Sequence, residues 1–137
     1  VQILAVLTMD GCLSSELYDK AHQDLCLDRC GLDEIRKNAL YRVTPDYSIS
    51  MLHEWRKDGT NIRYLAEATP DTADYINGLL RMHAVDEIIL YTVPFISGSG
   101  RHFFKSALPE QHWTLSSLKS YPNGVCRIIY ILDKKAR

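Results

Sequence analysis

Apolar residues along this chain gather in short runs of the length of a β-strand. The first run covers residues 1–8, and a later one covers 88–93, where β-branched and aromatic residues dominate. Both runs are too short for a globular helix and too uniformly apolar for a half-exposed strand. We therefore interpret them as strands that are covered on both faces. Further strands are predicted over residues 40–45, 61–66, 112–121 and 125–132.

Helical patterns occupy the intervals between these strands. Leu17, Ala21 and Leu25 fall on one helical stripe, and Gly31 interrupts the pattern before a second helical piece over 32–39. Two further helices are predicted. They cover residues 49–57, which Asp58-Gly59 would end, and 71–83, whose apolar positions are Ala73, Ile76, Leu79, Leu80 and Met82. Alternating strands and helices predict an α/β fold with a mostly parallel sheet.

The last two predicted strands flank Asn123-Gly124, and they predict a C-terminal antiparallel hairpin. An Asn-Gly pair commonly supplies two residues with positive φ to a tight turn. The residue before this pair is Pro122. We expect a two-residue turn in which both Asn123 and Gly124 have positive φ.

Composition narrows the class of protein. A chain of 137 residues suits a single domain over 1–137, and 46% hydrophobic with 24% charged residues is ordinary for a water-soluble protein. A net charge of −1 argues against nucleic-acid binding, and no apolar run reaches the roughly 18 residues of a membrane span. The start lacks the basic region of a signal peptide, so we expect a cytoplasmic protein. The four cysteines lack the spacing of a zinc site, which predicts free thiols and no metal.

Candidate chemistry lies where the predicted parallel strands end. Asp10-Gly11 follows the first strand. Residues 67–72 link another strand to a helix N-terminus, which would favour phosphate. A glycine-rich loop at 97–100 precedes Arg101. Each feature also has a purely structural interpretation. Asp10 would then hold its turn, Glu67 would be a solvated acid, and Arg101 would pair with a surface carboxylate.

The region after residue 84 contains a longer ordered pattern. It consists of Val85-Asp86-Glu87, the apolar run 88–93, Pro94, Phe95-Ile96, Ser97-Gly98-Ser99-Gly100, Arg101 and Phe104. This order resembles the reductase domain of the bifunctional riboflavin-biosynthesis deaminase-reductases, which belongs to the dihydrofolate-reductase-like superfamily. The Asp10-Gly11 turn and the C-terminal hairpin match the same family. The resemblance implies a three-layer fold, NADPH-dependent reduction of a small heterocyclic substrate, and a homodimer.

The resemblance also assigns roles to residues. It implies Asp10 as a catalytic residue, cofactor contacts from Ala68, Thr69, Thr72, Gly98 and Gly100, and substrate contacts from Gly11, Glu67 and Arg101. The chain departs from the family in two places. Ala68-Thr69 stands where the family has a glycine pair, and no glycine-arginine-x-threonine segment follows residue 40. Two alternatives therefore remain, a reductase-like domain that has lost its cofactor and serves as a ligand-binding or assembly module, and an unrelated small α/β domain.

Overall fold

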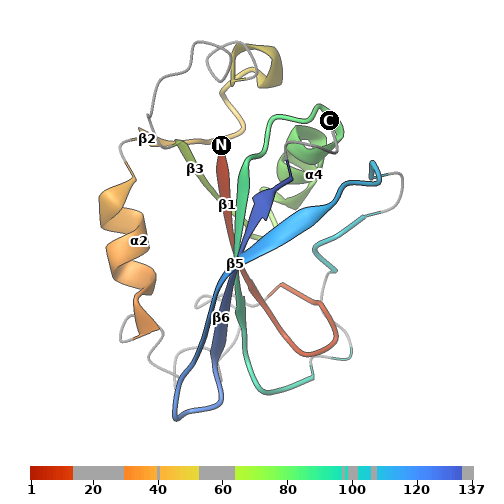
Figure 1. Ribbon diagram of the computed structural model, residues 1–137. Helices are drawn as coiled ribbons and strands as arrows, with labels where there is room; N and C mark the ends of the chain where they lie inside the picture. Colours follow the sequence, from red (N-terminus) through yellow and green to blue (C-terminus); the bar gives the residue numbers. More distant parts are fainter. Residues whose placement is uncertain are drawn as a thin grey trace.

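The computed structural model describes residues 1–13, 30–39, 41–52, 64–96, 98, 102–105 and 108–133. Within them, a six-stranded sheet has the order β2-β3-β1-β4-β6-β5 (Figure 1). The strands are β1 (Gln2–Leu7), β2 (Tyr41–Arg42), β3 (Tyr64–Glu67), β4 (Glu87–Thr92), β5 (Trp113–Ser120) and β6 (Cys126–Leu132). The pairs among β1 to β4 are parallel, whereas β6 is antiparallel to both β4 and β5. The predicted mostly parallel sheet with a C-terminal hairpin is confirmed.

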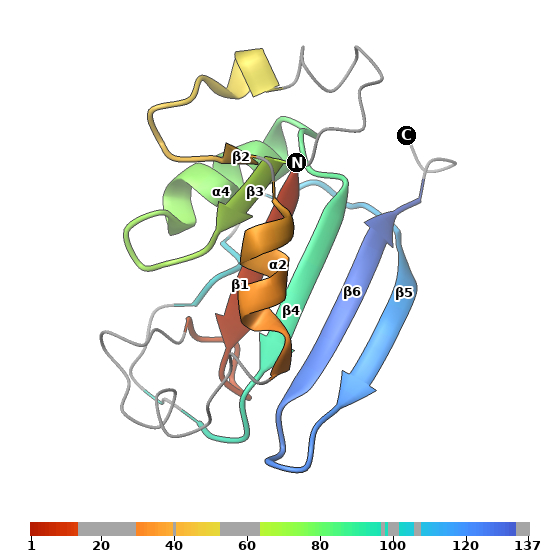
Figure 2. The ribbon, with the colours of Figure 1, turned by 90° about the vertical axis from the view of Figure 1, so that its left-hand side faces the viewer.

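Two helices cover opposite faces of this sheet. The helix α2 (Leu32–Asn38) lies on one face and α4 (Ala73–Arg81) on the other (Figure 2). Successive residues of a strand point to opposite faces, so Ile3 joins the core under α4, and Leu4 joins the core under α2. Both side chains have no exposed surface. Burial on both faces explains why the first apolar run contains almost no polar position.

The helix α4 is shorter than the sequence predicted. Four of its five predicted apolar positions are buried: Ala73, Ile76, Leu79 and Leu80. The fifth, Met82, is 51% exposed, because the helix ends at Arg81 and Met82 is the C-cap. His83 follows with a φ of 55°, a left-handed conformation that turns the chain out of the helix.

The prediction for the hairpin turn was wrong in detail. Gly124 has a φ of 91°, but Asn123 is not among the residues with positive φ. The N–H of Gly124 donates to the carbonyl of Tyr121 at 3.0 Å, and the N–H of Tyr121 donates to Val125 at 2.9 Å. This is a three-residue loop with one left-handed glycine. Pro122 is the physical reason, because its ring fixes a negative φ and makes it the first central residue of the turn.

Several predicted elements lie wholly or partly outside the described residues. These are the helix with Leu17, Ala21 and Leu25, the end of the helix over 49–57, and the loop positions Gly100 and Arg101. Residues 49–52 are helical as expected. No helix among the described residues is both long and apolar enough to cross a membrane.

Candidate functional site

The loops after β1 and β4 meet at the edge of the sheet where the parallel strands end, which we call the carboxyl edge. β1 and β4 end side by side, with Leu7 opposite Thr92. The N–H of Val93 continues the pairing to the carbonyl of Leu7 at 2.9 Å, and the N–H of Met9 donates to Phe95 at 2.9 Å. The turn that carries Asp10 is therefore fixed against the segment that leads into the glycine-rich loop.

Asp10 lies between these two loops. Its carboxylate accepts hydrogen bonds from the hydroxyl of Thr8, from the N–H of Gly98 at 2.9 Å and from the thiol of Cys12 at 3.7 Å. The residue is half-buried. The carboxylate therefore holds its own turn and the loop with Gly98, in agreement with the structural interpretation of Asp10. It also remains partly accessible at the carboxyl edge.

Gly11 and Gly98 supply the backbone on either side of Asp10. Both are left-handed, with φ of 80° and 74°. Among the described residues, a Cβ on Gly98 would meet no atom within 4 Å, and a Cβ on Gly11 would meet only the ring of His102, at 3.9 Å. Within that part of the chain, the backbone beside Asp10 therefore borders open space, which suits the approach of a ligand.

Asn77 is the buried support of this region. Its amide NH₂ donates to the carbonyls of Ala73 and Phe103, both at 2.8 Å, and its side-chain oxygen accepts the N–H of Lys105 at 3.1 Å. The N–H of Phe103 in turn donates to the carbonyl of Gly11 at 3.2 Å. Through these contacts α4 positions the segment after the glycine-rich loop. Asn77 was not predicted from the sequence, because a polar residue on a helix gives no signal for burial.

A second group of polar residues lies where β3 ends. The carboxylate of Glu67 receives the guanidinium of Arg36 from α2 and that of Arg42 from β2, each with a closest N–O distance of 2.5 Å. Two cations surround one anion, so this cluster has a formal charge of +1. The side chain of Arg42 is 56% exposed. Arg36 was not predicted, because 31 residues separate it from Glu67 and no local pattern links them.

The turn after Glu67 uses its own hydroxyl groups. The N–H of Thr69 donates to the hydroxyl of Thr72 at 2.9 Å, and the N–H of Thr72 donates to the hydroxyl of Thr69 at 3.2 Å. This reciprocal pattern resembles a capping box, but it lies in the turn that leads to Thr72, the N-cap of α4, and it satisfies two backbone donors of that turn. The N–H of Ala68 donates to the carbonyl of Leu4 at 2.7 Å. These three predicted cofactor residues are therefore committed to internal hydrogen bonds.

The two polar groups occupy different levels of the carboxyl edge. Glu67 lies opposite Leu4, whereas β1 continues for three more residues to Leu7 before it reaches the turn with Asp10. At about 3.3 Å per residue, the two levels differ by roughly 10 Å along the strand. The structure thus places Asp10, Gly11 and Gly98 together and Glu67, Thr69 and Thr72 together. In the described part of the chain, no group of three or more His, Cys, Asp or Glu side chains could hold a metal ion.

Several solved structures with a similar architecture are riboflavin-biosynthesis proteins. A putative riboflavin biosynthesis protein from Shewanella sp. PV-4 matches over 97% of this chain and 98% of its own, with a TM-score of 0.57 and 11% identity. RibD from Acinetobacter baumannii matches over 97% of this chain and 58% of its own, with a TM-score of 0.58 and 12% identity. The riboflavin biosynthesis reductase Rib7 of Saccharomyces cerevisiae matches over 97% and 88%, with a TM-score of 0.54 and 11% identity.

The chain has a riboflavin-reductase-like fold. This likeness confirms the dihydrofolate-reductase-like architecture that the sequence pattern after residue 84 predicted. Neither a family model nor a curated protein matches the sequence itself. At 11–12% identity, the likeness concerns the path of the backbone, and the chemistry has to be argued from the side chains at the carboxyl edge.

Proposed function

We propose that this protein is an NADPH-dependent reductase of a small heterocyclic substrate, with its site at the carboxyl edge of the sheet. The observation that carries the proposal is the linkage of the loops after β1 and β4 around Asp10, in a fold shared with riboflavin-biosynthesis reductases. In open α/β sheets, ligands bind outside the carboxyl ends of the strands. NADPH would supply the hydride, so the protein itself needs only to bind and orient the reactants.

The cations at the end of β3 fit the charge of such a cofactor. The side chain of Arg42 is 56% exposed, and its guanidinium lies beside Glu67, which also binds Arg36. A phosphate can receive two parallel hydrogen bonds from a guanidinium and would compete with Glu67 for this partner. Thr69 and Thr72 would then shape the turn, and Arg42 would replace the phosphate contacts of the absent glycine pair.

Asp10 would orient the substrate from the other level of the edge. The N–H of Gly98 and the hydroxyl of Thr8 fix its carboxylate, which gives any donor group of a heterocycle a defined acceptor. Gly11 and Gly98 leave room beside it. Gly100 and Arg101, which lie outside the described residues, complete the set that we assign to cofactor and substrate. Glu67 would contribute by holding the guanidinium groups of Arg36 and Arg42 in place.

Calorimetric titration with NADPH and NADH tests this proposal on the wild type and on Arg42→Ala. A hydrogen bond to a charged group contributes about 1.5–3 kcal/mol, so we expect NADPH affinity to fall at least about tenfold in the variant. Arg81→Ala, at the exposed end of α4, is the matched control. A fall for NADPH alone would assign Arg42 to the 2′-phosphate, and a fall for both would assign it to the pyrophosphate. Equal affinities in wild type and Arg42→Ala would contradict the assignment.

The internal hydrogen bonds of the turn after β3 favour a second candidate function. If Ala68, Thr69 and Thr72 retain their present partners, their donors are not available to a pyrophosphate. A reductase-like domain without cofactor would then act as a ligand-binding or assembly module. Absence of NADPH binding at millimolar concentration, in protein whose fold is verified by circular dichroism, would support this candidate.

We also propose that the protein forms a homodimer through the β5–β6 hairpin. Leu115 and Leu118 of β5 are 52% and 63% exposed, and they pair with Tyr130 and Ile128 of β6, so all four side chains share one face. The hairpin extends away from both helices (Figure 2). An apolar sheet face of this kind is typical of a surface that a partner covers. The cytoplasmic location predicted from the sequence stays a prediction.

A further inference from the structure

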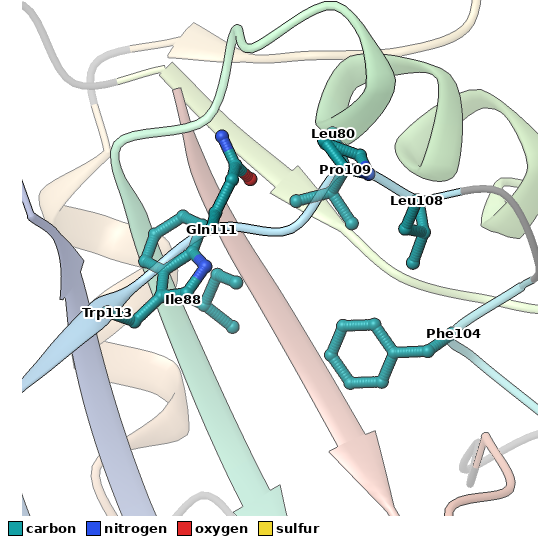
Figure 3. A pocket seen from close by; sticks show the side chains of 7 residues that line it. All are labelled: Leu80, Ile88, Phe104, Leu108, Pro109, Gln111 and Trp113. Atoms are coloured by element: carbon teal, nitrogen blue, oxygen red, sulfur yellow. The ribbon is translucent and has the colours of Figure 1, made fainter. Parts of the chain in front are cut away.

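An apolar pocket lies at the opposite end of the sheet from the carboxyl edge. Leu80 from the end of α4 and Ile88 from the start of β4 form its base, and each is only 5% exposed. The rings of Trp113 and Phe104 stand on opposite sides of Ile88 (Figure 3). Phe104, the last residue of the ordered pattern after residue 84, is 46% exposed at this pocket.

The sheet register separates this pocket from the proposed reductase site. Ile88 is the second residue of β4, opposite Ile3 near the start of β1. Trp113 is the first residue of β5, opposite Leu132 at the end of β6. Asp10 and Gly98, in contrast, follow the last residues of β1 and β4. A ligand held between Ile88 and Trp113 would therefore leave the space beside Asp10 open. Phe104 is the lining residue that leads back to the carboxyl edge, because it follows Phe103, whose N–H donates to Gly11.

The size of the pocket fits one aromatic ring. Its volume is about 160 Å³. An engineered apolar cavity of about 150 Å³ lined by leucine, isoleucine and phenylalanine stays dry and binds benzene. Two aromatic walls add a preference for a flat ligand, because aromatic pairs favour stacked and edge-to-face contacts.

Gln111 is the polar side chain of this pocket. Its amide nitrogen lies 2.9 Å from Nδ1 of His83, to which it donates when that ring nitrogen carries no proton. The nitrogen is then committed to His83, and the amide oxygen can accept a hydrogen bond from a ligand. His83 follows Met82, the C-cap of α4, and its hydrogen bond holds the Gln111 amide beside the end of that helix.

We infer that this pocket is a binding site for a single-ring aromatic molecule that carries a hydroxyl or N–H group. The base and the two rings bind the apolar part of the molecule, and Gln111 accepts its donor. Occupation does not require NADPH, so the inference is independent of the proposed reductase function.

Phenol and toluene are suitable probes, because they have nearly the same shape and only phenol can donate to Gln111. Their binding is followed by methyl NMR on the full chain, with the signals of Leu80, Ile88 and Leu108 as reporters. We expect saturable shifts at these methyl groups with both probes. Shifts that do not saturate, or that are absent from these methyl groups, would overturn the inference.

Two variants separate the pocket and its polar group. Leu108→Trp places a larger side chain in the pocket, and we expect it to weaken both probes at least tenfold. In Gln111→Leu, the ratio of the phenol to the toluene dissociation constant should rise about three- to tenfold, which corresponds to the net contribution of one hydrogen bond. Unchanged binding in a folded Leu108→Trp protein would refute the site. If Leu108→Trp does not fold, the ratio of the phenol to the toluene dissociation constant in Gln111→Leu becomes the test. A ratio equal to that of wild type would refute the inference.

Discussion

Replacing Asn77 by leucine tests whether a buried amide holds the segment after the glycine-rich loop in place. Asn77 has no exposed surface, and its three hydrogen bonds join α4 to the backbone of Phe103 and Lys105. Leucine has nearly the same size and removes the amide. The carbonyl of Phe103 and the N–H of Lys105 then lose their partner, whereas the carbonyl of Ala73 remains inside the helix.

The expected loss follows from these two backbone groups. A buried donor or acceptor left without a partner costs about 1–3 kcal/mol. Phe103 is fully buried and Lys105 is half-buried, so the free energy of unfolding should fall by about 2–5 kcal/mol. This is a large part of the roughly 5–15 kcal/mol that stabilises a typical domain. For a chain of this length, each kcal/mol lowers Tm by about 3–5 °C.

Urea denaturation of wild type and Asn77→Leu measures this loss, and thermal melts provide an independent reading. We expect a lower midpoint with an unchanged slope, because the native state stays compact. Asn38→Leu is the matched control, since it makes the same substitution at the exposed end of α2 and should change the free energy of unfolding by less than about 0.5 kcal/mol. If Asn77→Leu is no more destabilising than this control, the assigned role of the amide is wrong.

Three further comparisons test other parts of the structure. Gly124→Ala should lower the free energy of unfolding more than Gly98→Ala does. Both positions are left-handed, but the new Cβ at Gly124 would lie 3.1 Å from Pro94. Equal losses of unfolding free energy in urea denaturation would contradict the turn geometry. Burial raises the pKa of Tyr91 to about 12. Wild type should therefore lose stability relative to Tyr91→Phe as pH rises from 10 to 12, because the unfolded chain ionises first. Below pH 10 the difference between the two proteins should be constant, and a constant difference through pH 12 would contradict the raised pKa. Leu118→Lys should convert the proposed dimer to a 15.7 kDa monomer in light scattering, and a wild-type monomer would refute the dimer.

Local sequence patterns predicted the parts of the fold that burial alone determines. The run over 88–93 became β4, and the stripe through Ile76, Leu79 and Leu80 became the buried face of α4. Hydrophobic burial acts on each segment separately, so its period is visible in the sequence. The hairpin turn shows the limit of such rules, since Pro122 displaced the turn that Asn-Gly commonly forms.

The candidate site was harder to predict, because its contacts join distant residues. The Asp10 carboxylate meets the N–H of Gly98 across 88 positions, and Arg36 meets Glu67 across 31. A sequence pattern predicts that a strand ends shortly before Asp10. It does not show which backbone N–H the packed sheet brings to the Asp10 carboxylate. The resemblance to riboflavin-biosynthesis reductases singled out Asp10 and Glu67, which lie where β1 and β3 end, and their assigned roles stay predictions. It carried no information about Asn77 or Arg36.

The most direct test of the account is an amide NMR titration of the ¹⁵N-labelled full chain with NADPH. We expect saturable shifts at the carboxyl edge, including Asp10, Gly98 and the turn with Thr69 and Thr72. The signal of Trp113, at the other end of the sheet, should not change. Absence of shifts at millimolar NADPH, or shifts that gather around Trp113, would contradict a reductase site at the carboxyl edge.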